Sequence, residues 1–81
     1  MNAVTEKVYK RCGQILEDRS FGEDVLSVFD DIASIAKVDT DTVFRVLIGL
    51  KLTRVLYNKN VQDSLTDAAN YCILWAAYKD Q

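Results

Sequence analysis

Histidine and proline are absent from this chain of 81 residues, which has only three glycines and two cysteines. Without histidine the chain lacks the commonest general base, so any catalysis would have to use carboxylates, lysine or a metal ion. Cys12 and Cys72 form no CxxC pair, which argues against a structural zinc site. Both fall on apolar helical faces, and we expect them to be small core residues.

Long apolar runs are also missing. No run reaches the roughly 18 residues that a membrane span needs, and nothing resembles a signal peptide, so we expect a cytoplasmic protein without membrane contact. The net charge is −2, which argues against a binder of duplex DNA because such a protein needs a broad basic face. A small anionic ligand held by two or three cations remains compatible with this charge.

The length and composition indicate one globular domain, residues 1–81, with 49% apolar residues. Strand-type alternation is absent, whereas a 3.6-residue period recurs throughout. The sequence therefore predicts an all-α fold, a compact bundle of four helices with short connections and antiparallel neighbours. The expected helices cover residues 3–17, 21–37, 41–57 and 61–78. Their expected N-caps are Asn2, Ser20 (in a capping box with Glu23), Thr40 and Asn60.

The apolar stripes predict which side chains are buried. The first two helices would turn inward Val4, Val8, Cys12, Ile15, Leu16, Val25, Val28, Phe29, Ile32, Ile35 and Ala36. The third helix is apolar nearly all round. Gly49 in its middle either allows close approach of another helix or a ligand, or is simply tolerated there. A chain this short buries only about 60% of its unfolded surface, so we expect a homo-oligomer, most simply a dimer, with residues 41–57 at its centre.

The stretch from Asp63 to Tyr71 is the most distinctive part of the chain. On a helix, Asp63, Asp67 and Asn70 stand above one another at i, i+4 and i+7. Such a stripe can hold a divalent cation, a lysine or a base edge, or it can simply be a solvated face. Asp63 also has a second interpretation, as a residue that favours the positive end of the helix dipole. The apolar face of the same helix would contain Leu65, Ala68, Ala69 and Cys72.

A second polar line, Lys51, Arg54 and Asn58, runs along the third helix inside its apolar surface. An antiparallel fourth helix would bring Asp63 and Asp67 back to face these cations. A structural salt-bridge network explains that arrangement fully. Because desolvation offsets the Coulomb gain of buried pairs, their presence in so small a core is also a hint of function.

Five segments, in this order, carry a resemblance to a known family. They are Glu17-Asp18-Arg19, Phe21-Gly22-Glu23, Phe29-Asp30-Asp31-Ile32-Ala33, Lys51-Leu52-Thr53-Arg54 and the run from Asp63 to Asn70-Tyr71. Over residues 11–77 the chain resembles the small phage-encoded members of the MazG-like, all-α nucleotide pyrophosphohydrolase group, including nucleotide-modification-associated domains.

This resemblance implies a nucleotide site that lacks some of the carboxylates needed for hydrolysis. It implies nucleotide contacts from Lys51, Arg54, Asp63, Asp67, Asn70 and Tyr71, with Mg²⁺ held by Asp63 and Asp67. Active members of the group hold Mg²⁺ with four carboxylates on two helices. Here Ser27 and Val28 stand where the first pair of acids would be expected. We therefore expect nucleotide binding with slow or absent hydrolysis.

Three functions stay open on the sequence alone. The first is a phage-encoded nucleotide-binding protein with a degenerate MazG-like site, which sequesters a nucleotide signal or inhibits a host defence in the host cytoplasm. The second is a helical interaction protein that binds and inhibits a host enzyme without nucleotide. The third is a weak Mg²⁺-dependent nucleotide pyrophosphohydrolase. The expected partners are thus a nucleotide or a host protein, together with a second copy of the chain.

Overall fold

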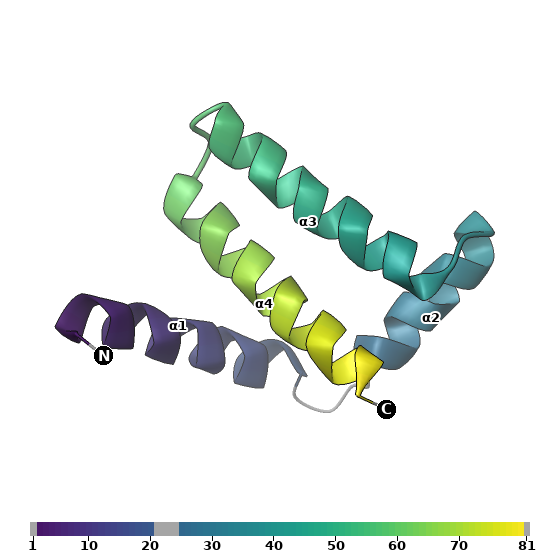
Figure 1. Cartoon of the computed structure of the whole chain (residues 1–81), viewed down its shortest axis with the longest axis horizontal. Helices are drawn as coiled ribbons and strands as arrows, with labels where there is room; N and C mark the ends of the chain where they lie inside the picture. Colours follow the sequence, from purple (N-terminus) through teal and green to yellow (C-terminus); the bar gives the residue numbers. More distant parts are fainter. Residues whose placement is uncertain (1, 21–24, 81) are drawn as a thin grey trace.

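The computed structural model describes residues 2–20 and 25–80, which form four helices (Figure 1). They are α1 (Ala3–Ser20), α2 (Val25–Ala36), α3 (Thr40–Leu56) and α4 (Val61–Lys79), and the described ranges contain no strand. The predicted all-α class with four helices is confirmed. Ser20 is the last residue of α1 rather than a cap of α2, and the remainder of the expected capping box, up to Glu23, lies outside the described residues.

An antiparallel hairpin of α3 and α4 is the centre of the fold (Figure 1). α1 packs on α4, while α2 packs on α3 at the end of the hairpin where α3 begins and α4 ends. The radius of gyration is 13.5 Å, whereas a compact chain of this length has about 11.7 Å. The structure is therefore more open than the compact bundle that the sequence suggested.

The core is an aromatic cluster around Phe44, whose side chain is 0% exposed. Its ring makes a T-shaped contact with that of Phe29 from α2, with the ring centroids 4.9 Å apart. It also stacks on the ring of Trp75 from α4, with a centroid separation of 5.8 Å. Tyr78 adds a tilted contact at 5.9 Å. Such pairs add about 0.5–1.5 kcal/mol each beyond the area they bury. One side chain of α3 thus joins α2 and α4 to the same core.

The start of α3 is fixed by polar contacts that the sequence did not fully reveal. The N-cap is Asp39, which accepts hydrogen bonds of 2.7 Å from both the backbone N–H and the hydroxyl of Thr42. These bonds lower the pKa of Asp39. The prediction of Thr40 as cap is wrong, because Thr40 is the first helical residue and its buried hydroxyl donates to Asp30 of α2 at 2.7 Å. Asn60 does stand at the N-cap of α4, but without a side-chain capping bond.

Several residues expected in the core are exposed. Cys12, Phe29 and Ala68 are buried as predicted, whereas Cys72 is exposed, contrary to expectation. Leu65 and Ala69 lie on the same uncovered side of α4 as Cys72, because α1 and α3 pack against other faces of that helix. The same lack of cover explains the exposed members of the first two stripes, namely Val4, Val8, Val28, Ile32, Ile35 and Ala36.

Within the described ranges, none of the helices combines the length and the apolar character that crossing a membrane would require.

Asp41 links the beginning of α3 to the end of α4. Its carboxylate accepts a hydrogen bond of 2.7 Å from the indole N–H of Trp75 and another of 3.2 Å from Lys79. These two bonds hold the pKa of Asp41 below its ordinary value of 3.8, and the bond from Trp75 has the larger effect. A carboxyl with a lowered pKa stabilises the folded state at pH values above 3.8 and loses that contribution as the pH falls through its folded pKa.

We therefore expect the free energy of unfolding to drop as the pH falls below about 4, and to drop less steeply in Asp41→Asn. Urea unfolding followed by Trp75 fluorescence at a series of pH values measures this. The matched control is Asp31→Asn, which removes an exposed carboxylate of α2. An identical pH dependence in the wild type and Asp41→Asn would contradict the role of Asp41.

Candidate functional site

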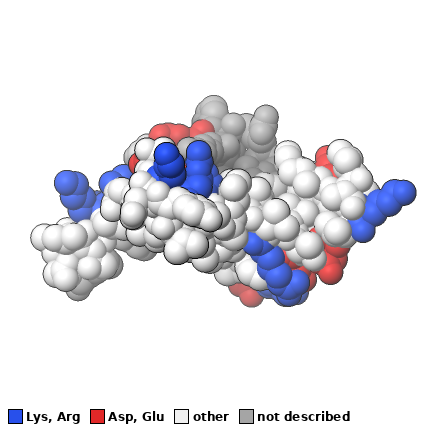
Figure 2. All heavy atoms as spheres, turned by 90° about the horizontal axis from the view of Figure 1, so that it is seen from above, with Lys and Arg blue, Asp and Glu red and all other residues white. Residues whose placement is uncertain are grey.

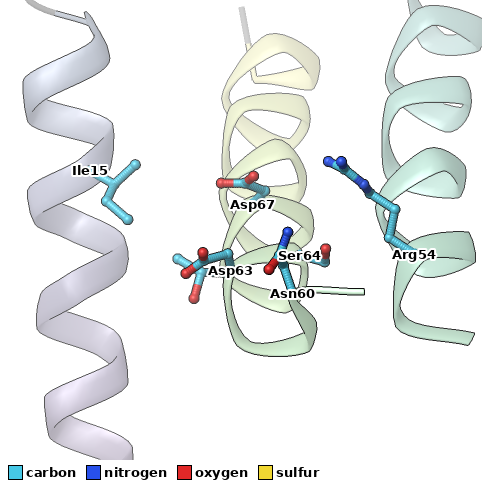
Figure 3. A pocket seen from close by; sticks show the side chains of 7 residues that line it. Ile15, Arg54, Asn60, Asp63, Ser64 and Asp67 are labelled. Atoms are coloured by element: carbon cyan, nitrogen blue, oxygen red, sulfur yellow. The ribbon is translucent and has the colours of Figure 1, made fainter. Parts of the chain in front are cut away.

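A polar cavity of about 330 Å³ lies over α4, between α1 and α3 (Figure 3). Figure 3 shows the side chain of Arg54 reaching from α3 toward α4, with Asp63 and Asp67 on the face of α4 between the two other helices. The cavity is lined by Ile15, Arg54, Asn60, Asp63, Ser64, Thr66 and Asp67. Its volume falls at the lower end of the range of small-molecule sites, which is roughly 300–1,000 Å³.

A well-shielded ion pair stands beside this cavity. The ammonium of Lys51 lies 2.9 Å from a carboxylate oxygen of Asp67, and both side chains are only 14% exposed. Lys51 and Asp67 meet because the hairpin places the second half of α3 beside the first half of α4. The predicted pairing across the hairpin is confirmed for these two residues, and Arg54 shares the cavity with both Asp63 and Asp67.

α1 contributes a third cation near the cavity. The guanidinium of Arg11 donates to the hydroxyl of Thr66 at 3.3 Å, and its Nε is buried without a hydrogen-bond partner. Asn70, one helical turn after Thr66, is 5% exposed, and both polar atoms of its side chain are buried without a partner. Buried polar atoms without partners are costly and are uncommon in folded proteins. The α1–α4 contact is therefore polar beyond what packing alone requires.

The six residues predicted for the site do not all come together. Lys51, Arg54, Asp63 and Asp67 lie at or beside the cavity, which matches the expected arrangement of the two polar lines. Asn70 is buried and is not among the residues that line the cavity. Tyr71 packs against the hydrophobic core, with its ring 6.2 Å from that of Phe29. Its ring is thus part of the core, and Tyr71 is not among the residues that line the cavity, where a nucleotide contact was expected.

Sequence patterns missed several residues of the site. Ser64 and Thr66 are almost completely buried, and their hydroxyls bond to the carbonyls of Lys59 at 3.3 Å and Gln62 at 2.9 Å. Small polar residues beside Asp63 and Asp67 could have drawn attention to this side of α4. Arg11 offered no comparable signal, because its partner Thr66 is 55 residues away in the sequence.

Mg²⁺, which the resemblance implies at Asp63 and Asp67, finds few ligands at this site. Among residues 2–20 and 25–80, no group of three or more histidine, cysteine, aspartate or glutamate side chains could hold a metal ion. The carboxylate of Asp67 is already balanced by Lys51. Since Mg²⁺ prefers six oxygen ligands, these residues do not fit a resident metal ion, and Asp63 and Asp67 would meet Mg²⁺ only if it arrived on the phosphates of a ligand.

Comparisons of this chain with protein-family models, with curated proteins and with solved structures find no match. The geometry of the cavity and the order of the sequence motifs are consequently the two features that indicate a function.

The Lys51–Asp67 pair makes a direct prediction. Asp67→Ala leaves the ammonium of Lys51 without its carboxylate in a shielded place, and we expect it to lower the free energy of unfolding by about 3–5 kcal/mol. Replacing both residues, as Lys51→Met with Asp67→Leu, should restore stability to within about 1 kcal/mol of the wild type, because apolar side chains of similar volume avoid the desolvation cost. Urea unfolding followed by tryptophan fluorescence compares the three proteins. A loss below about 0.5 kcal/mol in Asp67→Ala would mean that the pair behaves as an ordinary surface ion pair.

Proposed function

We propose that this chain is a small nucleotide-binding protein that holds the phosphate groups of its ligand in the cavity between α1, α3 and α4. The observation that carries the proposal is the meeting of Arg54 from α3 with Asp63 and Asp67 from α4 in one cavity of about 330 Å³, with Lys51 of α3 paired to Asp67 beside it. The proposal also draws on the resemblance to small phage-encoded MazG-like proteins. On that basis the protein is phage-encoded and sequesters a nucleotide signal, or counters a host defence, in the host cytoplasm.

The charges around the cavity favour an anionic ligand. Among the residues that the structure describes, three cations lie at or beside the cavity, because Arg54 lines it, Lys51 pairs with a lining residue and Arg11 donates to another. Two carboxylates, Asp63 and Asp67, oppose them. These described side chains have one more positive than negative charge, which suits a phosphate group. The planar guanidinium of Arg54 matches phosphate oxygens with two parallel hydrogen bonds.

The carboxylates have a role that differs from phosphate binding. As ionised groups they only accept hydrogen bonds, so Asp63 and Asp67 would bind the sugar hydroxyls or an amino group of the base. Asn60 and Ser64 add an amide and a hydroxyl at the same cavity. In this arrangement the side chains of α3 bind the phosphate groups, and those of α4 bind the nucleoside part of the ligand.

Turnover is not part of the proposal. Attack of water on a phosphoanhydride needs an activated water, which requires a base or a metal centre besides the groups that bind the substrate. The described residues provide no cluster of three acids, and Asp67 is paired with Lys51. We therefore expect no multiple turnovers when pyrophosphate release is assayed with Mg²⁺ or Mn²⁺. Turnovers that disappear in Asp63→Asn would favour the pyrophosphohydrolase instead.

Binding is tested with a panel of mono-, di- and triphosphate nucleotides and cyclic or oligonucleotide signals, each with and without Mg²⁺. Thermal shift provides the screen, because a ligand of the native state raises the unfolding midpoint by mass action. Isothermal titration then gives the dissociation constant for the best ligand. Arg54→Ala should weaken binding roughly 10- to 100-fold, as expected for a lost hydrogen bond to a charged group.

The matched control is Arg45→Ala, which removes an arginine of the same helix that lies over Trp75, 5.6 Å from the ring centroid and away from the cavity. Arg45→Ala should bind nucleotide as the wild type does. Equal losses in both variants, or no binding of any member of the panel to the wild type, would refute the proposed site.

One observation favours a second function, that of a helical interaction protein which binds and inhibits a host enzyme. A groove of about 220 Å³ lies between α2 and α3, and its lining is apolar apart from Thr42. The lining residues are Ile32, Ala36, Val38, Thr42, Val43, Val46 and Leu47. Failure of the nucleotide panel, together with a host enzyme whose inhibition is abolished by Val38→Glu but not by Arg54→Ala, would support this second function.

A further inference from the structure

The side of α3 that faces away from α4 is an uncharged apolar surface. We call it the outer face of α3, and it consists of Val46, Gly49, Leu50, Thr53, Leu56 and Tyr57, all of which are exposed. The four large side chains among them, Val46, Leu50, Leu56 and Tyr57, are between 52% and 75% exposed. Figure 1 places α3 uppermost, and the view from above in Figure 2 shows a broad area without charge across the middle of the molecule.

The polar groups of this part of α3 turn away from the outer face. Lys51 pairs with Asp67 on the side of α3 that faces α4. Arg54 stands at the edge of the outer face, one turn after Leu50, and its side chain extends into the cavity. The hydroxyl of Thr53 donates to the carbonyl of Gly49 at 2.8 Å, which leaves its methyl group on the surface. A Cβ atom added at Gly49 would meet nothing within 4 Å, so the backbone of α3 is open to close approach at this point.

The chain also exposes more surface than a folded monomer of its size. Its accessible surface is 5922 Å², whereas the average relation for monomeric proteins gives about 4,900 Å² for 9.2 kDa. The excess of roughly 1,000 Å² is close to the ~800 Å² that each partner buries in a protein–protein interface of standard size. One such interface would bring the exposed area to that of an ordinary folded protein.

We propose that the outer face of α3 is the contact between two copies of this chain, with their α3 helices antiparallel across a two-fold axis. A charge-free apolar face can meet itself without repulsion, which a two-fold contact requires. The ends of the face are complementary, because Asp39 lies just before α3 and Lys59 just after it, and both are exposed. In the antiparallel arrangement each Asp39 approaches Lys59 of the second copy, and the helix dipoles oppose one another.

This pairing places Gly49, midway between Asp39 and Lys59, at the two-fold axis. The two helices come closest there, and a glycine gives the smallest separation. The antiparallel pairing also gives a reason for a glycine in the middle of an exposed helical face, where alanine would stabilise the helix by about 1 kcal/mol. The polar cavity stays open in this dimer, because it lies on the other side of α3.

Sedimentation equilibrium of the full chain over a micromolar concentration series tests the contact. The wild type should have twice the monomer mass of 9.2 kDa. Leu50→Glu brings two like charges together at the axis and should weaken the dimer by about 100-fold or more. Leu65→Glu is the matched control, because Leu65 is exposed to 45% on the uncovered side of α4. A monomeric wild type, or equal dissociation in both variants, would overturn the proposal. The outer face of α3 would then be a surface for a different protein.

A cross-link tests the antiparallel arrangement and does not depend on the folding of Leu50→Glu. In a Cys72→Ser background, which removes the exposed thiol, Gly49→Cys should give a disulfide-linked dimer under mild oxidation. Leu65→Cys in the same background should remain mainly unlinked. Absence of the Gly49→Cys cross-link in a protein that sediments as a dimer would contradict the placement of Gly49 at the axis.

Discussion

The burial of the Phe44 ring is the contact on which the rest of the structure depends. Phe44 is the one large side chain with no exposed surface among the described residues, and it touches aromatic rings of both α2 and α4. Phe44 fixes how α3 lies against α4. It therefore also determines which side chains face each other two helical turns further on, where Lys51 reaches Asp67. The polar site is therefore a consequence of the register that the aromatic core imposes.

α3 serves two purposes with its two sides. Its cations point toward α4 and supply the positive charge of the cavity, which leaves the opposite side free of charge between Arg45 and Lys59. A hairpin with two further helices is too small to cover a helix that is apolar nearly all round. Binding a ligand on one side and a second copy on the other would use both sides of α3 without competition.

The sequence predicted what depends on local periodicity. The four helices, the apolar surface of α3 and the meeting of Lys51 with Asp67 follow from spacings within one helix or one hairpin. The sequence did not predict which apolar stripes would be buried, because burial depends on how α1 and α2 pack against the hairpin. Cys72 and Ile35 are exposed for this reason. The contact of Arg11 with Thr66 spans 55 residues and left no local pattern. Tyr71 followed the aspartates in sequence but belongs to the aromatic core.

An NMR titration of the full chain with the tightest nucleotide of the panel tests the ligand site most directly. Chemical-shift changes in a nitrogen–proton correlation spectrum show which backbone amides sense the ligand. We predict changes at Arg54, Asp63 and Ser64, which surround the cavity, and none at Val46 or Leu50 on the outer face of α3. Changes confined to the outer face, or spread evenly over all four helices, would contradict a ligand site between α1, α3 and α4.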